Sequence, residues 1–205
     1  MPEFIKYGTD PKLDAIIDKG SWKDRLEIAE QGYGLNVLVN DTSSKVRAAV
    51  AKQGYGLEAL VYDDSKNVRL EVAKQGYGFD ILIENSWNDD EDDRTNQILC
   101  ELAKRKYGLN RLINHPLPEV RIEVAKQGYG LDILASDSNW QVREAVAEQG
   151  HSLDVLINDE DWRVRCEVAY NGYGLDTLTN DEHYRVRMAV VHKGHNLDKL
   201  IDDED

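Results

Sequence analysis

The decapeptide AKQGYGLEAL, at Ala51–Leu60, decides the fold because the chain repeats it along its whole length. Copies begin at Ala29, Ala73, Ala103, Ala125, Ala147, Ala169 and Val191. Successive copies are 22 residues apart, except that 30 residues separate the copies at Ala73 and Ala103. A fixed period of this length predicts a stack of small supersecondary units, each of which buries its apolar face against its neighbours.

Composition and charge suit such a stack. The chain has 205 residues, of which 41% are apolar and 31% charged, and its formal net charge is −14. A surface this acidic repels phosphate backbones, so we do not expect nucleic-acid binding. No window has the pattern of a signal peptide or a membrane span, so we expect a cytoplasmic protein without membrane contact.

The two cysteines, Cys100 and Cys166, occupy the same position in two different repeats. Other repeats place apolar residues there, namely Leu26, Leu70, Ile122 and Met188. We therefore interpret both cysteines as small apolar core residues. We predict no disulfide, no metal site and no cofactor, since two cysteines alone cannot hold an iron–sulfur cluster.

One repeat, residues 43–63, predicts two helices. Ser43 is a good N-cap, and Gly54, the first glycine of the decapeptide and here called the marker glycine, ends the first helix after about ten residues. Gly56 opens a second helix of at most two turns, α or 3₁₀, and we interpret Ser152 and Asn196 in that position as N-caps. The residues expected to face inward are Val46, Val50, Ala51, Leu57, Leu60 and Val61. The N-cap position also holds Ser21, Ser65, Thr95, Asn139 and Asp161.

A Val–Arg pair precedes the apolar helix in most repeats, and an L-x-x-L pattern follows it. The pairs are Val46-Arg47, Val68-Arg69, Val120-Arg121, Val142-Arg143, Val164-Arg165 and Val186-Arg187. This pattern resembles the leucine-rich repeat variant family and, more distantly, HEAT and armadillo-like repeats. The resemblance implies an all-α, right-handed solenoid of about eight 22-residue two-helix repeats with a binding surface. Some members carry an N-terminal iron–sulfur module, but this sequence has no cysteine cluster for one.

We expect residues 1–20 to form a partial, capping repeat and residues 21–205 to form one continuous array. One repeat departs from the period by carrying eight extra residues, which we place at 86–94. This insertion contains the acidic run Asp89 to Asp93, and we predict a solvated loop there, with helical pattern resuming at Ile98. Trp87 in the same insertion is a candidate partner contact.

Two repeated positions carry side chains with chemistry but are best interpreted as structural. An Asp lies six residues before most of the repeating Arg residues, a spacing that predicts a ladder between the turns of adjacent repeats. We expect it to be interrupted near the insertion, where Asn85, Leu99 and His115 replace its members. We expect Arg143→Ala to destabilise the fold by about 1–3 kcal/mol. The Tyr that follows the marker glycine recurs in nearly every repeat, so we predict that it packs in the turn.

The C-terminal repeats differ from the others at positions that the core does not fix. Large aromatic residues stand ten residues before three successive marker glycines, and arginines follow two of them. Tyr and His replace the usual Lys two residues before the last two marker glycines. Because Trp, Tyr and Arg dominate protein interfaces, we predict a partner-binding patch there. Its members are Trp140, Trp162, Arg163, Tyr170, Tyr184, Arg185 and His192.

No catalytic constellation is evident in the sequence, and we predict that the protein is not an enzyme. The glycines belong to the repeat, and His192 and His195 do not share a helix face on which to hold zinc. We predict a scaffold that binds a protein or peptide. One alternative is an acidic inhibitor or nucleic-acid mimic that binds a basic partner. A second alternative is a HEAT-like protein that binds or modifies nucleic acid through the Trp–Arg patch.

Overall fold

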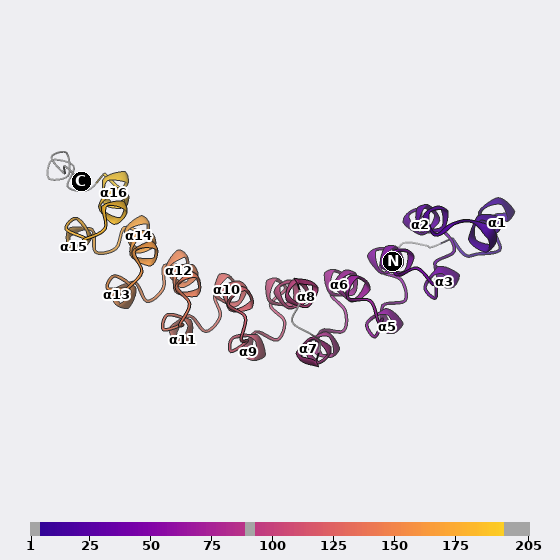
Figure 1. Cartoon of the computed structure of the whole chain (residues 1–205), viewed down its shortest axis with the longest axis horizontal. Coiled ribbons are helices and arrows are strands. Elements are labelled where there is room, and N and C mark those ends of the chain that lie inside the picture. The colour runs from indigo at the N-terminus through magenta and orange to yellow at the C-terminus, as the bar shows by residue number, and fades with distance from the viewer. Residues whose placement is uncertain (1–4, 89–92, 195–205) are drawn as a thin grey trace. The chain divides into compact units, whose positions relative to one another are not determined.

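The computed structural model describes residues 5–88 and 93–194, without the side chains of residues 86–88 and 93 (Figure 1). Its internal contacts divide the chain into two compact units, Met1–Gly108 and Leu109–Asp205. The continuity of the array across this boundary, and the capping role of residues 1–20, remain predictions from the sequence.

Within the described residues of the first unit, long helices alternate with short ones. The long helices are α1 (Pro11–Lys19), α2 (Trp22–Glu30), α4 (Ser44–Lys52), α6 (Lys66–Lys74) and α8 (Asp93–Lys104). The connecting helices are α3 (Leu35–Leu38), α5 (Leu57–Leu60) and the extended α7 (Phe79–Asn88). Consecutive long helices from α2 to α8 pack against one another.

The second unit repeats the same alternation over its described residues. Its long helices are α10 (Pro118–Lys126), α12 (Trp140–Glu148), α14 (Trp162–Tyr170) and α16 (Tyr184–His192). The four-residue helices are α9 (Leu109–Leu112), α11 (Leu131–Leu134), α13 (Leu153–Leu156) and α15 (Leu175–Leu178). Each unit therefore has two layers: Figure 1 shows the long helices side by side along one side and the short helices along the other.

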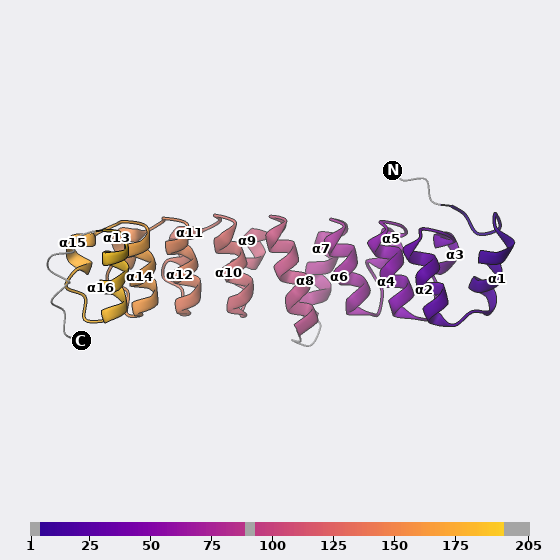
Figure 2. The same cartoon turned by 90° about the horizontal axis from the view of Figure 1, so that it is seen from above.

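The predicted all-helical repeat fold is confirmed. Figure 2 shows the long helices of each unit lying nearly parallel, as expected for repeats that bury their apolar faces on their neighbours. The described residues contain no strand, and their one isolated β-bridge joins Ile5 to Tyr33. The core includes five of the six predicted positions: Val46, Val50, Ala51 and Val61 are 0% exposed and Leu60 is 3% exposed. The sixth, Leu57, is only half-buried, which corrects that part of the prediction.

The marker glycine ends the long helices as predicted, except after α8, where Lys106 holds the marker position at φ +62°. After α4, the N–H of Gly54 donates to the carbonyl of Ala51 at 2.8 Å, and the N–H of Tyr55 donates to the carbonyl of Val50 at 3.3 Å. Gly54 has φ +78°. This pair of hydrogen bonds is a Schellman motif, which requires a left-handed residue after the helix and so favours glycine.

The second glycine of the repeat opens the short helix at the N-cap position, as predicted, and a left-handed backbone is what that position requires. Gly56 is left-handed, with φ +64°, and a Cβ there would lie 2.6 Å from Cγ2 of Val39 in the preceding repeat. Ser152 holds the same position at φ +52°, and its side chain makes no capping hydrogen bond. Ser152 thus stands at the predicted N-cap position but does not cap the helix through its side chain: the position demands a left-handed backbone and space against the preceding repeat. Asn196 lies outside the described residues.

The N-terminal residues also place an apolar side chain against the second glycine of the following repeat, but they do so from a longer helix. Helix α1 has nine residues rather than four, and Asp10 caps it by accepting the N–H of Lys12 at 2.9 Å. Ile17 is 7% exposed. A Cβ on Gly34 would lie 2.4 Å from Cδ1 of Ile17, just as a Cβ on Gly56 would meet Val39. Ile17 thus covers the first regular repeat in the way that each short helix covers the next.

The described residues of the insertion, 86–88 and 93–94, are helical, whereas the loop predicted for the acidic run Asp89 to Asp93 falls outside the described residues except for Asp93. Helix α7 continues to Asn88 and helix α8 begins at Asp93, so the extra residues lengthen both helices. Helix α8 therefore starts before Ile98, and Thr95, the predicted N-cap, lies inside it and is 2% exposed. The residues between the two helices, 89–92, lie outside the described part of the structure, as does the side chain of Trp87.

Deletion of residues 87–94 should leave the protein folded. The deletion joins Ser86 to Thr95 and restores the 22-residue spacing between Gly76 and Lys106. The residues that line up with the core of other repeats, including Leu82, Ile98 and Leu102, are all 0% exposed and are retained. We expect an unchanged far-ultraviolet circular dichroism spectrum per residue and a cooperative melt. Insoluble or unfolded protein would show that the helical extensions are required for the fold.

Candidate functional site

The repeating arginines form a structural ladder, as predicted. Arg47 donates from Nη1 to the carbonyl of Asp41, in the turn before its own helix α4, at 2.8 Å. Its other two donors, Nε and Nη2, reach both carboxylate oxygens of Asp63, in the turn before the next long helix α6, at 2.6 and 2.8 Å. The same carboxylate accepts the N–H of Ser65, so it also caps the next helix. Forks of this kind begin at Arg25, Arg47, Arg121, Arg143 and Arg165.

The predicted interruption of the ladder falls near the insertion. Leu99 stands in the arginine position and is 0% exposed, so it contributes to the core. His115 stands in the aspartate position and keeps part of its role: its Nδ1 accepts the N–H of Leu117 at 3.3 Å, and its carbonyl accepts Nη1 of Arg121 at 2.7 Å. The imidazole of His115 thus takes over the helix-capping role of the aspartate carboxylate. It does not take part in an arginine fork, because Leu99 stands in the arginine position.

The tyrosines after the marker glycines are only in part the packing residues that the sequence predicts. Tyr33 is 2% exposed and donates to Asp14 at 2.7 Å. Others are between 40% and 45% exposed, at Tyr77, Tyr107, Tyr129 and Tyr173. Tyr107 stacks on Phe79 of the preceding repeat, with ring centroids 3.4 Å apart. The predicted packing in the turn is thus seen at Tyr33 and Tyr107, while these four rings keep a large part of their surface exposed to solvent.

The aromatic and arginine residues of the C-terminal repeats do come together, all within the second unit. The guanidinium of Arg163 lies 4.0 Å from the ring centre of Trp140 and 5.2 Å from that of Trp162. The guanidinium of Arg185 lies 4.9 Å from Trp162, and its Nε donates to the hydroxyl of Tyr184 at 3.1 Å. Cations over aromatic faces stabilise this arrangement, so the rings and arginines interleave along the starts of α12, α14 and α16.

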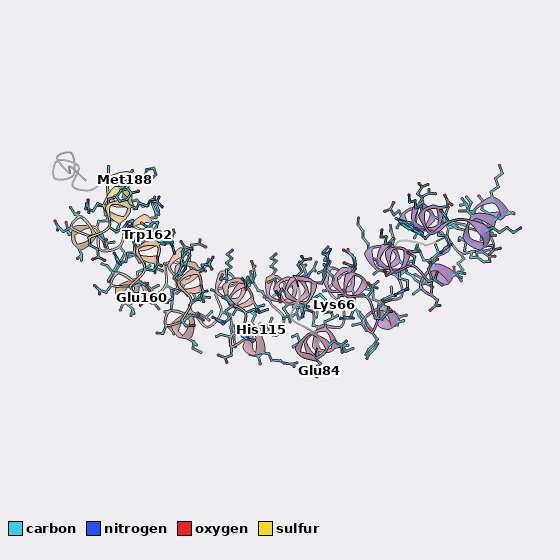
Figure 3. All side chains as sticks on the ribbon, viewed as in Figure 1. Lys66, Glu84, His115, Glu160, Trp162 and Met188 are labelled. Atoms are coloured by element: carbon cyan, nitrogen blue, oxygen red, sulfur yellow. The ribbon has the colours of Figure 1, made fainter. Side chains whose placement is uncertain are left out.

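Next to this stack the surface is hollowed into a groove of about 760 Å³. Its lining residues are Glu144, Trp162, Arg163, Cys166, Glu167, Tyr170, Tyr184, Arg185 and Met188. They come from α12, α14 and α16, and Figure 3 places Trp162 and Met188 on the long helices. Trp162, Arg163, Tyr170, Tyr184 and Arg185 line the groove. Trp140 stacks behind it, and His192 meets the Tyr170 ring edge-on at 6.1 Å.

Three of the lining residues, Cys166, Tyr170 and Met188, give the groove apolar surface. Cys166 is 8% exposed, and burial raises the pKa of its thiol to about 11, so the thiol stays neutral at pH 7. This confirms the interpretation of Cys166 as an apolar core residue. Met188 is 62% exposed and Tyr170 is 46% exposed, so both offer apolar surface to a bound molecule.

Two half-buried carboxylates line the same groove. Burial, followed by the nearby charges of Glu148 and Glu167, raises the pKa of Glu144. Burial and the charge of Glu148 likewise raise the pKa of Glu167. The groove therefore combines aromatic rings, arginines that stack on them and carboxylates that are partly removed from water.

Sequence reasoning missed Glu144, Glu167 and His183. His183 stacks on Trp162 with ring centroids 4.3 Å apart and planes 2° from parallel. Glu144 could have been found, because it stands where other repeats have Leu26, Leu70 or Ile122, and a carboxylate in an apolar position is a departure. Glu167 could not have been found by type alone, since several repeats have glutamate at that position.

Two further features of the described residues bear on the kind of site. They contain no group of three or more His, Cys, Asp or Glu side chains arranged to hold a metal ion. None of the described helices has the length and apolar character needed to cross a membrane.

Two-helix units that repeat at a fixed period and pack on their neighbours define a helical repeat protein. The chain is similar to a solved structure described as a leucine-rich repeat variant with a novel repetitive protein structural motif. The TM-score is 0.65 and the identity 25%, over 87% of this chain and 78% of that one. The resemblance predicted from the Val–Arg pairs is thereby confirmed. No protein-family model matches the chain, and no curated protein sequence matches it significantly.

Proposed function

We propose that the protein is a non-enzymatic repeat scaffold and that the groove across α12, α14 and α16 binds a segment of another protein. The observation that carries this proposal is the composition of the groove. Trp162, Tyr170 and Tyr184 line it together with Arg163 and Arg185, and these are the residue types that most often dominate interfaces. Glu144 and Glu167 on the same surface disfavour a nucleic-acid backbone.

The repeat architecture supports a binding role over a catalytic one. Each repeat contacts only its neighbours, so side chains on the long-helix face form an extended surface rather than an enclosed cleft. The same structural position varies between repeats without loss of the fold: Trp162 and Tyr184 occupy the place that Ser44 and Lys66 occupy in the first unit. Residues that the fold does not require are free to serve recognition.

Substitution of Trp162 by serine should weaken partner binding by about 30-fold, which corresponds to about 2 kcal/mol. Serine is native to this position in another repeat, as Ser44 shows, and the loss of stability should be only about 1 kcal/mol from the lost stacking. The partner is obtained by affinity capture with the full chain from source cells. Its affinity for the purified variants is then measured by calorimetry, and their stability by thermal melting.

The matched control is Trp22→Ser. Trp22 holds the same position in the first unit, is 36% exposed and has the ammonium of Lys45 4.4 Å from its ring centre. The Trp22→Ser variant should lose about as much thermal stability as Trp162→Ser, but its affinity for the partner should be unchanged. If both variants lose affinity equally, or if Trp162→Ser keeps its affinity, the groove is not part of the binding surface.

A further inference from the structure

Glutamates on the long helices usually have a cation on the same helix. The position five residues before the marker glycine holds Glu71, whose carboxylate pairs with Lys74 at 2.8 Å. Its equivalent Glu123 lies 3.9 Å from Lys126. Glu101, again in this position, pairs with Arg105 at 2.8 Å. A neighbouring cation on the same helix face thus compensates the glutamate in these repeats.

Glu167 occupies this same position in α14, but Tyr170 stands where the lysine would be. A second carboxylate, Glu144, faces the groove from α12, and the residue four positions further on is Glu148 rather than a cation. Among the described residues, neither Glu144 nor Glu167 makes a hydrogen bond or an ion pair through its carboxylate. The groove therefore holds two half-buried carboxylates that lack the compensation found in other repeats.

The arginines of the groove make no ion pair with these carboxylates. The charge of Arg163 opposes the rise in the pKa of Glu144, and the charge of Lys193 opposes that of Glu167, but burial outweighs both and each pKa stays raised. Arg163 lies over the rings of Trp140 and Trp162, and its Nη1 contacts the carboxylate of Asp161 at 3.2 Å. Arg185 lies over Trp162 and donates to Tyr184. Glu144 and Glu167 are therefore offset only by cations that do not pair with them directly, so a bound cation could still form the first direct ion pair with either carboxylate.

We propose that the groove receives a lysine or arginine side chain of the bound protein segment, with its charged end between Glu144 and Glu167. This inference rests on the proposed function. A half-buried carboxylate favours a charged partner, because an ion pair replaces the water that burial removes. The aliphatic stem of the entering side chain would lie along Tyr170 and Met188, whose exposed surfaces line the path to the two carboxylates.

The experiment selects random dodecapeptides displayed on phage against the full-length chain and against three variants. The first is the double variant Glu144→Gln/Glu167→Gln, and the second is Trp162→Ser. The third is a control, the double variant Glu71→Gln/Glu123→Gln. Wild type and control should enrich peptides with Lys or Arg at one fixed position beside apolar residues. The Glu144→Gln/Glu167→Gln variant should lose that preference. Trp162→Ser should lose the peptides altogether.

The affinities of synthetic peptides from the wild-type selection then measure the interaction between the basic residue of the peptide and the two glutamates of the groove. Replacing the fixed basic residue with methionine should weaken binding about tenfold to wild type and by less than twofold to Glu144→Gln/Glu167→Gln. Groove-dependent peptides without a basic preference, or enriched in Asp and Glu, would overturn this inference but leave the proposed function standing. Failure to select any peptide that depends on Trp162 would overturn both.

Discussion

Arg143→Ala is expected to lower the free energy of unfolding by about 3 kcal/mol, because it leaves a buried carboxylate without its partner. The side chains of Arg143 and Asp159 are 8% and 5% exposed. Three donors are lost at once: two to the Asp159 carboxylate, at 2.6 and 2.9 Å, and one to the carbonyl of Asp137 at 2.7 Å. The hydrogen bond to Asp159 also raises the pKa of Arg143 above its ordinary value, so the arginine is charged at any accessible pH.

Chemical denaturation measures this loss against two controls. Arg143→Lys keeps the charge but not the fork, and it should recover only part of the stability. Arg111→Ala removes an exposed arginine from the short helix α9 and should change stability by less than about 0.5 kcal/mol. If Arg143→Ala denatures like Arg111→Ala, the ladder does not stabilise the repeats and the arginine position must be reconsidered as a binding feature.

Ala135→Ile is expected to destabilise the second unit by about 2 kcal/mol through overpacking. Each short helix ends beside a residue that meets the second glycine of the next repeat. A Cβ on Gly174 would lie 2.1 Å from Cδ1 of Ile157, and a Cβ on Gly130 would lie 2.1 Å from Cδ1 of Ile113. Where serine replaces that glycine, at Ser152, the preceding repeat has Ala135 instead of isoleucine. The small residue makes room for the serine Cβ.

The compensating change is Ser152→Gly, which should rescue Ala135→Ile. Alone, Ser152→Gly should stabilise the protein by about 1 kcal/mol, because it relieves a left-handed backbone at a residue with a Cβ. In the double variant the isoleucine occupies the space that Ile157 occupies beneath Gly174, so stability should return to within about 0.5 kcal/mol of wild type. Additive effects of the two changes in a denaturation cycle would show that residues 135 and 152 do not share this space.

Periodicity predicts most of this fold because the residue at each position can be compared across eight copies of the repeat in one chain. The positions of Val46, Gly54 and Arg47 each have one physical role, which recurs, so a single interpretation covers them all. The start of the helix after the insertion was mispredicted as Ile98, because the acidic composition of the insertion does not indicate how far the flanking helix extends, and α8 begins at Asp93. The N-cap position of Ser152 was predicted, but its left-handed backbone was not, because serine is a common side-chain cap in other helices.

The candidate site was predictable only where residues depart from the repeat. Trp162 is conspicuous because large aromatic residues hold its position in three successive repeats, and Arg163 because only one other repeat has arginine in its place. Glu167 is not, because glutamate is common at its position and only the replacement of the helix's lysine by Tyr170 makes it different. The groove itself arises from the spacing of three helices, which no single repeat encodes.

The central claim, that the long-helix surface of the second unit is the binding surface, is tested most directly by photo-crosslinking in source cells. A photoreactive phenylalanine analogue replaces Met188, which lines the groove and is 62% exposed, or Ile133, which lies on the short helix α11 and is 63% exposed. Because the two positions are equally accessible, the comparison reports location rather than exposure. We predict a discrete crosslinked protein from position 188 and none from position 133. The same adduct from position 133, with none from position 188, would contradict the account.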